Sequence, residues 1–353
     1  MRLNYHDTHN SLPAGRGGPN ARTANGGTIQ THDRNWGPWI AMTPFMEQGS
    51  LYELYTSSIA KTYTGGSATG TDARSPGYIF PPWHNNYTSP NYNACNPDYR
   101  NLCSAQFDTM KCPSDANAKF FFGVLGALST DVTDASLAKN SMRNYVYNRG
   151  DWIGNSANLG GWNSGDNNEV FRNNNVRGPF ASGIWFGLES CSDGTSSTLS
   201  FSEAAVTPKA LSPTIRGGTV QFATAANVLT PKNCLDTKDG KYLKVSTGIT
   251  IGNPEYGMLF DGRRLAGFTT VLPPNNPSCA PSADFHYSFG INTPNSYHSG
   301  GVNAALMDGS VRFVSETVDA GNPSDIQPTA GGPSVYGVWG AMGSKNGGES
   351  KGL

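Results

Sequence analysis

Residues 301–314 constrain the fold most strongly, because their pattern fits one kind of element. Apolar residues occupy alternate positions along the first half: Val302, Ala304 and Leu306. Such alternation puts them on one face of a β-strand. The pair Asp308-Gly309 then interrupts the pattern before Ser310–Val314 resumes it. Asp-Gly is typical of a two-residue type I′ turn, in which both central residues have φ > 0. The segment therefore predicts a β-hairpin whose register is set by Asp308 and Gly309.

His298 precedes this hairpin by a few residues, which raises the question of whether it shares an active or metal site with Asp308. A strand rises about 3.3 Å per residue, so the two side chains should lie about 20 Å apart, at opposite ends of one strand. We therefore expect Asp308 to serve the turn. His298 should pack or form hydrogen bonds near Gly300 and Gly301, with a role as a ligand left open.

Two helical regions are expected near the N-terminus. Residues 1–12 resemble the last turns of a helix that ends at Pro13. In residues 35–60, Thr43 is expected to cap a helix that ends at Gly49, and Ser50 with Glu53 to cap a second helix. Strands are expected at 144–152, 183–190, 197–206, 218–226 and 266–272.

Composition supports a loop-rich α+β fold: a pilin-like antiparallel β-sheet with few helices and long irregular loops. The 353 residues include 43 Gly and 23 Pro, only 14% are charged, and the net charge is −1. This charge balance gives no electrostatic reason to bind nucleic acid or an anionic membrane. We expect one domain over 1–353, with a possible insertion lobe at 61–110 and an extended C-terminal tail at 320–353.

Six cysteines are disulfide candidates: Cys95, Cys103, Cys112, Cys191, Cys234 and Cys279. No C-x2-C pair occurs, which disfavours a zinc ribbon. An even number in a loop-rich chain indicates disulfides and an oxidising compartment, with buried thiols as the alternative. The first three cysteines are close enough for one local bridge. The connectivity stays open. The sequence contains no apolar stretch long enough to span a membrane and no signal peptide.

Two other places hold candidate metal ligands. Asp193-Gly194 forms a predicted tight turn, and the oxygens of Asp193 and Asp308 are candidates for calcium. An Asx-turn is the commoner use of such an aspartate. His6, Asp7 and His9 could also bind a metal, or simply form an exposed helix end. We expect no other cofactor. Because the usual nucleophile, phosphate and dinucleotide motifs are missing, we expect no enzyme.

Eight segments in order resemble one family: residues 4–15, 39–55, 111–115, 144–151, 193–203, 268–280, 297–319 and 336–349. Together they are similar to a large planctomycete family of prepilin-like proteins of unknown function. That family carries an H-x9-DG motif, here formed by His298, Asp308 and Gly309. Its members resemble type IV pilins and type II secretion pseudopilins.

The resemblance implies a structural or interaction protein, the head of a pilin-like or pseudopilin-like subunit of a cell-surface or secretion assembly. It also implies an extracellular or periplasmic location and anchoring by an apolar helix upstream of residues 4–15. Partners would be other pilin-like subunits or a second copy. The alternative is an extracellular solute- or glycan-binding module. Its stacking candidates are Trp36, Trp39, Trp83, Trp152 and Trp162.

Overall fold

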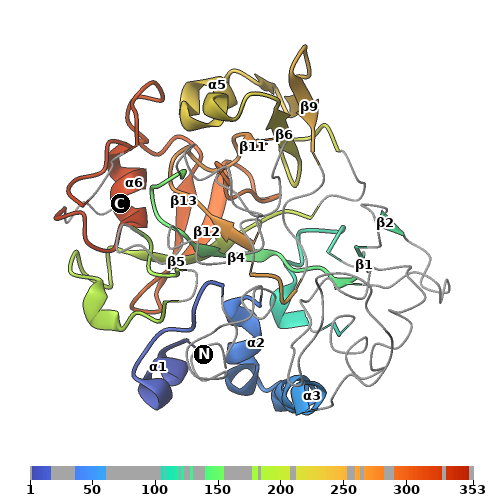
Figure 1. The fold of residues 1–353 in the computed structure, drawn as a ribbon, viewed down its shortest axis with the longest axis vertical. Helices are drawn as coiled ribbons and strands as arrows, with labels where there is room; N and C mark the ends of the chain where they lie inside the picture. Colours follow the sequence, from blue (N-terminus) through green and yellow to red (C-terminus); the bar gives the residue numbers. More distant parts are fainter. Residues whose placement is uncertain are drawn as a thin grey trace, which may run out of the picture.

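The computed structural model describes most of the chain. The described residues are 2–16, 36–60, 105–106, 108–118, 121–122, 128–129, 140–154, 177–181, 184–206, 212–252, 259–262, 266–281, 290–327 and 331–349. Within them, short helices and several small sheets alternate with long irregular connections (Figure 1). The predicted α+β class is confirmed. The predicted insertion lobe lies almost wholly outside the described residues.

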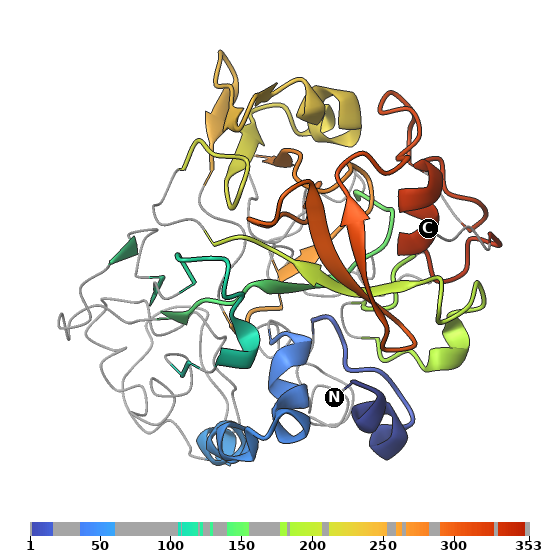
Figure 2. The same cartoon turned by 180° about the vertical axis from the view of Figure 1, so that it is seen from behind.

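A five-stranded sheet forms the centre of the molecule, in the order β10-β4-β5-β12-β13 (Figure 2). Its strands are β4 (Tyr145–Asn148), β5 (Leu199–Glu203), β10 (Gly267–Phe268), β12 (Gly301–Leu306) and β13 (Val311–Ser315). All neighbours are antiparallel except β10 and β4, which run parallel. The sheet is therefore mixed, and β13 forms one of its edges. The strands predicted in 144–152 and 197–206 are confirmed.

The β12–β13 hairpin is confirmed, but its turn differs from the prediction. Ala305 pairs with Val311, and the N–H of Leu306 donates to the carbonyl of Ser310 at 2.8 Å. Three residues, 307–309, thus form the loop, and only Gly309 has positive φ, at 94°. Asp308 Oδ1 accepts hydrogen bonds from both the N–H and the hydroxyl of Ser310. This Asx-type turn makes φ > 0 at Asp308 unnecessary, so the type I′ prediction is wrong.

The C-terminal segment covers one face of the central sheet, which corrects the prediction of an extended tail. Helix α6 (Gly337–Gly343) places the fully buried Trp339 beside Phe268 of β10. The Trp339 indole N–H donates to the carbonyl of Leu272 at 2.8 Å. Val302, Leu306 and Val314 belong to the same cluster. Burial of these side chains, about 1.5–3 kcal/mol each, is the physical reason why the segment folds back.

The N-terminal helices lie below the sheet in Figure 1 and contact its other face. They are α1 (Arg2–His9), α2 (Pro38–Met42), the 3-10 helix η2 (Thr43–Met46) and α3 (Gly49–Ala60). Trp39 of α2 contacts Phe201 of β5, with ring centroids 4.9 Å apart. The helices predicted around 1–12 and 50–60 are confirmed.

The predicted cap at Thr43 and the predicted end at Gly49 are wrong. The Thr43 hydroxyl donates backwards to the carbonyl of Ile40 at 2.7 Å, so it does not cap η2, which begins at Thr43 itself. Glu47, with φ of 59°, ends η2, and Gly49 begins α3.

A second sheet, in the order β11-β6-β9, lies at the end of the molecule opposite α1–α3 (Figure 1). Its strands are β6 (Thr219–Phe222), β9 (Ile249–Ile251) and β11 (Ser278–Pro281), which confirms the strand predicted in 218–226. The 3-10 helix η10 (Ala225–Leu229) and α5 (Pro231–Leu235) pack beside it.

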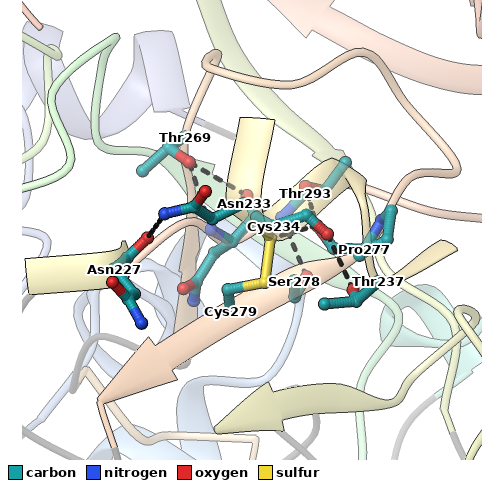
Figure 3. The surroundings of a disulfide bond; sticks show 10 residues. Asn227, Asn233, Cys234, Thr237, Thr269, Pro277, Ser278, Cys279 and Thr293 are labelled. Atoms are coloured by element: carbon teal, nitrogen blue, oxygen red, sulfur yellow. Dashed lines mark hydrogen bonds between the residues drawn. A yellow bond between two sulfur atoms is a disulfide. The ribbon is translucent and has the colours of Figure 1, made fainter. Parts of the chain in front are cut away.

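A disulfide joins Cys234 of α5 to Cys279 of β11 (Figure 3). Both cysteines are fully buried, among residues that include Val228, Val220 and Leu243. The bond fits an extracellular or periplasmic location, because disulfides persist in oxidising compartments.

The remaining elements are short. They are η5 (Asp108–Met110), β1 (Phe121–Phe122), β2 (Leu128–Ser129), β3 (Asn140–Ser141), η9 (Leu188–Ser190), β7 (Lys238–Asp239) and β8 (Tyr242–Leu243). The strand predicted at 183–190 is wrong, because residues 184–187 are irregular and η9 follows. None of the helices in the described part of the chain has the length and apolar character that a membrane crossing requires.

Candidate functional site

Three side chains from distant parts of the sequence converge where β5 ends and where β4 and β12 begin. Cys112, Glu203 and His298 place one sulfur, one carboxylate oxygen and one ring nitrogen within 4.8 Å of one another. His298 Nε2 lies 3.1 Å from Glu203 Oε1 and 3.7 Å from Cys112 Sγ. Within the ranges the structure describes, this is the only such group of three potential metal ligands.

Glu203, the last residue of β5, is held by the neighbouring strand. The backbone N–H of Asn303 donates to its Oε2 at 2.8 Å, and the Asn303 side-chain amide donates to Oε1 at 3.2 Å. The side chain is only 6% exposed. A buried carboxylate requires such partners, because an unpaired buried charge costs several kcal/mol. Oε1 is thereby aimed at His298.

Cys112 lies in a turn that is fixed to the sheet by Asn144, immediately before β4. The Asn144 side chain accepts a hydrogen bond from the N–H of Cys112 at 2.8 Å. Its amide group donates to Asp115 Oδ2 at 2.6 Å and to the carbonyl of Ala204 at 3.0 Å. Asp115 Oδ2 also accepts the N–H of Val206 at 2.7 Å. This buried network fixes the turn, and with it the thiol, next to the end of β5.

His298 lies in the loop before β12. The backbone N–H of His298 donates to Ser296 Oγ at 3.1 Å, and the Ser296 hydroxyl donates to the carbonyl of Gly301 at 2.8 Å. The side chain is 31% exposed, so the cluster reaches solvent on this side. The loop backbone thus positions the ring, and Nε2 faces inward.

Burial and neighbouring charge shift two further groups near the cluster. Burial raises the pKa of Tyr145, and the negative charges that Cys112 and Glu203 can carry raise it further. Burial also raises the pKa of Asp115, although hydrogen bonds from Val206, Asn117 and Asn144 oppose that rise. On the side of Tyr145 and Asp115 the cluster is therefore shielded from water, and charges interact more strongly there than in bulk solvent.

The geometry favours convergence on one ion over a nucleophilic relay. In a cysteine–histidine–carboxylate relay, one ring nitrogen faces the sulfur and the other faces the carboxylate. Here the same nitrogen, Nε2, faces both Sγ and Oε1. A thiolate, an imidazole and a carboxylate that share one centre form a donor set suited to zinc.

His298 and Asp308, the two polar residues of the H-x9-DG motif, lie at opposite ends of β12, as predicted. Within the described part of the chain, His298 contacts Cys112, Glu203 and Ser296 and not Asp308. Of the two roles left open for His298, packing near Gly300 and Gly301 or acting as a ligand, the contacts with Cys112 and Glu203 favour the ligand role.

Asp193 and Gly194 form the predicted tight turn, with Gly194 at φ of 104°. Both Asp193 oxygens accept backbone N–H groups, from Gly347 at 2.6 Å and from Gly348 at 3.0 Å. The turn therefore ties β5 to the C-terminal segment. Calcium at Asp193 or Asp308 stays a prediction, and neither residue belongs to the group of three ligands.

The six predicted half-cystines divide into three groups. Cys234 and Cys279 are bonded, whereas Cys112 and Cys191 carry thiols, so the disulfide prediction is wrong for these two. The reason at Cys112 is its neighbourhood, in which the thiol faces an imidazole and a carboxylate instead of a second sulfur. Cys95 and Cys103 lie outside the described residues.

The other candidate ligands are separated or engaged. His6 Nε2 accepts the N–H of Leu188, and His9 stacks on Tyr5. Two of the proposed sugar-stacking tryptophans, Trp36 and Trp39, are core residues at 0% and 4% exposure. Trp152 is partly buried, and Trp83 and Trp162 lie outside the described residues.

The sequence patterns missed the roles of Glu203 and Cys112. A usable signal was nevertheless present, because residues 111–115, 193–203 and 297–319 each contribute one ligand, and all three segments carry the family resemblance. Each segment alone is uninformative about the site. Their convergence is a property of the fold.

A family model described as "Protein of unknown function (DUF1559)" matches residues 3–321. This range includes Cys112, Glu203 and His298. No curated protein and no solved structure matches the chain.

Proposed function

Since the chain belongs to the DUF1559 family, whose description assigns no activity, we propose that it is a structural and interaction protein, the head of a pilin-like subunit. The proposal takes the planctomycete prepilin-like proteins as its relatives. In this role the chain needs no catalytic group and no cofactor. Its partners are other pilin-like subunits, in the first place a second copy of itself.

The observation that carries this proposal is an apolar strip on an edge strand. Val311 and Phe313 of β13 are 65% and 50% exposed, and they point to the same side because they are two residues apart. β13 borders the central sheet, and among the strands that the structure describes none pairs with the outer side of its backbone. Natural proteins usually protect such edges by charges, bulges or covering loops, and an exposed apolar edge favours association with another chain.

The strip is also held in place. A Cβ at Gly301 would lie 2.9 Å from Phe313 Cζ, so the ring packs closely over the first residue of β12. This contact gives Phe313 a defined position while half of it stays exposed. A partner therefore meets an ordered apolar surface.

The disulfide agrees with an extracellular or periplasmic head. We propose that the native protein is anchored by an apolar helix ahead of residues 4–15, as the resemblance implies. The alternative of a glycan-binding module depends on aromatic side chains in loops. It gains little support from Trp36 and Trp39, since both are buried.

Sedimentation velocity over a wide concentration range tests the proposed role. We expect the wild-type chain to self-associate. Phe313→Lys should weaken that association by about 4- to 12-fold, because Phe313 is 50% exposed and covering its exposed half contributes about 0.8–1.5 kcal/mol. Ile326→Lys is the matched control: Ile326 is 77% exposed but lies outside the sheet, so its replacement should leave association unchanged. A wild-type chain that stays monomeric throughout, or equal effects of both variants, would contradict the proposal.

A further inference from the structure

We propose that Cys112, Glu203 and His298 form a zinc site that joins three segments of the chain. This site goes beyond the proposed function, because an interaction subunit requires no metal. The segments are far apart in sequence: 186 residues separate Cys112 from His298, and 95 separate Glu203 from His298. Convergence of three different donor types from three segments is the observation that needs an explanation.

The distances fit a tetrahedral ion. With Zn–S of about 2.3 Å and Zn–N and Zn–O of about 2.0–2.2 Å, tetrahedral ligand atoms lie about 3.3–3.6 Å apart. The observed separations are 3.7 Å for Sγ and Nε2, and 3.1 Å for Nε2 and Oε1. All three ligand atoms lie within 4.8 Å of one another, so local side-chain movements would bring them onto one ion.

Charge balance supports a divalent ion. A cysteine thiolate and the Glu203 carboxylate bring two negative charges to a place where both side chains are almost fully buried. Zinc would neutralise these charges, and neutralisation removes most of the cost of burying them. The sulfur selects a borderline-soft metal over calcium or magnesium, which prefer oxygen ligands.

Each ligand also has supporting contacts of the kind that metal sites show. Asn303 holds Glu203 through two hydrogen bonds, Asn144 holds the turn of Cys112, and Ser296 holds the backbone of His298. Such outer contacts orient ligands before the metal arrives. Water would supply the fourth ligand, because the His298 side chain is 31% exposed and the cluster is open to solvent there.

The site couples metal binding to folding. Zinc would also stabilise the fold, because only the folded chain brings the three ligands together. The ion would fasten the turn at residues 111–118 to the central sheet.

Competition for Zn²⁺ against a chromophoric chelator tests the site on the full chain. The expected result is one Zn²⁺ per wild-type chain, with affinity reduced more than about 10-fold in each of Cys112→Ser, Glu203→Gln and His298→Gln. Cys191→Ser is the matched control, because Cys191 also carries a buried thiol but lies outside the cluster. Circular dichroism would check that each variant folds.

A second measurement needs no variant. Alkylation of the folded wild-type chain, mapped by mass spectrometry, should show that Zn²⁺ slows modification of Cys112 at least about 10-fold and leaves Cys191 unaffected. The two thiol residues are similarly buried, at 7% and 6% exposure, so Cys191 is an internal reference. No Zn²⁺ bound by the wild type, unchanged affinity in all three variants, or equal protection of both thiols would overturn the proposal.

Discussion

The Cys234–Cys279 pair and the Cys112 cluster both place cysteine sulfur in the interior, yet they serve different chemistry. Around the disulfide, each sulfur meets the other sulfur inside a buried cluster that includes Val228 and Leu243. Figure 3 shows hydrogen-bonded asparagine, threonine and serine residues around the bond. Around Cys112, the sulfur meets His298 Nε2 and Glu203 lies beside it. The same residue type therefore forms a covalent crosslink in one region and a candidate metal ligand in the other, depending on its neighbours.

The two regions also differ in how they connect the chain. The disulfide joins α5 to β11 across 45 residues within the second sheet and its covering helices. The cluster links the turn at 111–118 to both β5 and the loop before β12. We therefore expect a reductant to destabilise the region of the disulfide and a metal chelator to destabilise the region of the Cys112 cluster.

The largest expected effect comes from the disulfide. Replacing both cysteines, as Cys234→Ser with Cys279→Ser, should lower the free energy of unfolding by about 4 kcal/mol, since a 45-residue loop loses its constraint in the unfolded chain. Urea denaturation measures this. The single variant Cys112→Ser, assayed without metal, should cost clearly less. Equal losses would remove the distinction between the two sulfur regions.

Zinc should produce the next largest effect, and only through the cluster. At a free Zn²⁺ concentration about 100 times the Kd, the folded state should gain about 2.7 kcal/mol. Thermal unfolding with and without a chelator measures the gain. The variant that lacks the disulfide should keep this response, whereas Glu203→Gln should lose it. If the stabilisation by zinc disappeared when the disulfide was removed, the metal site and the disulfide would not be independent.

Lys345 lies near the second buried thiol, Cys191, and we expect it to make the stability of the fold depend on pH under alkaline conditions. Burial lowers the pKa of Lys345 to about 8, while Cys191 and Asp151 oppose that shift. Since the unfolded chain then holds more protons between about pH 8 and 10.5, the contribution of Lys345 to stability rises with pH in this window.

Lys345→Met should abolish that rise, which we expect to amount to about 1–2 kcal/mol. Urea denaturation at pH 8 and pH 10, without metal, gives the difference between wild type and variant. An identical pH dependence for both proteins would mean that Lys345 is not the group that titrates.

The smallest expected effect concerns the support of His298. Ser296→Ala removes the hydroxyl that accepts the His298 N–H and donates to the Gly301 carbonyl. We expect a loss of about 1 kcal/mol in stability and a several-fold loss in Zn²⁺ affinity. Ser324→Ala is the control, because Ser324 is exposed in a turn and no member of the cluster is among its hydrogen-bond partners. Unchanged Zn²⁺ affinity in Ser296→Ala would show that the ring is positioned by other contacts.

Local patterns predicted the elements whose signals are local. The alternation at 301–306 gave the hairpin strands, and the strand within 197–206 followed in the same way. At 183–190 the same kind of pattern failed, because residues 184–187 are irregular and a 3-10 turn follows. Helix α6 was not predicted, because the Gly, Pro and Ser residues in and around it are typical of loops. Its apolar residues, including Trp339 and Met342, are too few to show a helical period.

The candidate site could not be predicted from spacing. Cys112, Glu203 and His298 are brought together by the antiparallel pairing of β5 with β4 and β12, and by the docking of the Cys112 turn on Asn144. The separation of His298 from Asp308 could be predicted, because it requires only the rise of one strand. Contacts between segments about 100 residues apart depend on tertiary structure.

X-ray absorption at the zinc edge on the Zn²⁺-loaded wild-type chain tests the central contrast most directly. We expect one sulfur neighbour at about 2.3 Å and nitrogen or oxygen neighbours at about 2.0–2.2 Å, with the sulfur signal lost in Cys112→Ser and retained in Cys191→Ser. A bound zinc surrounded only by nitrogen and oxygen, or a sulfur signal that survives in Cys112→Ser, would contradict it.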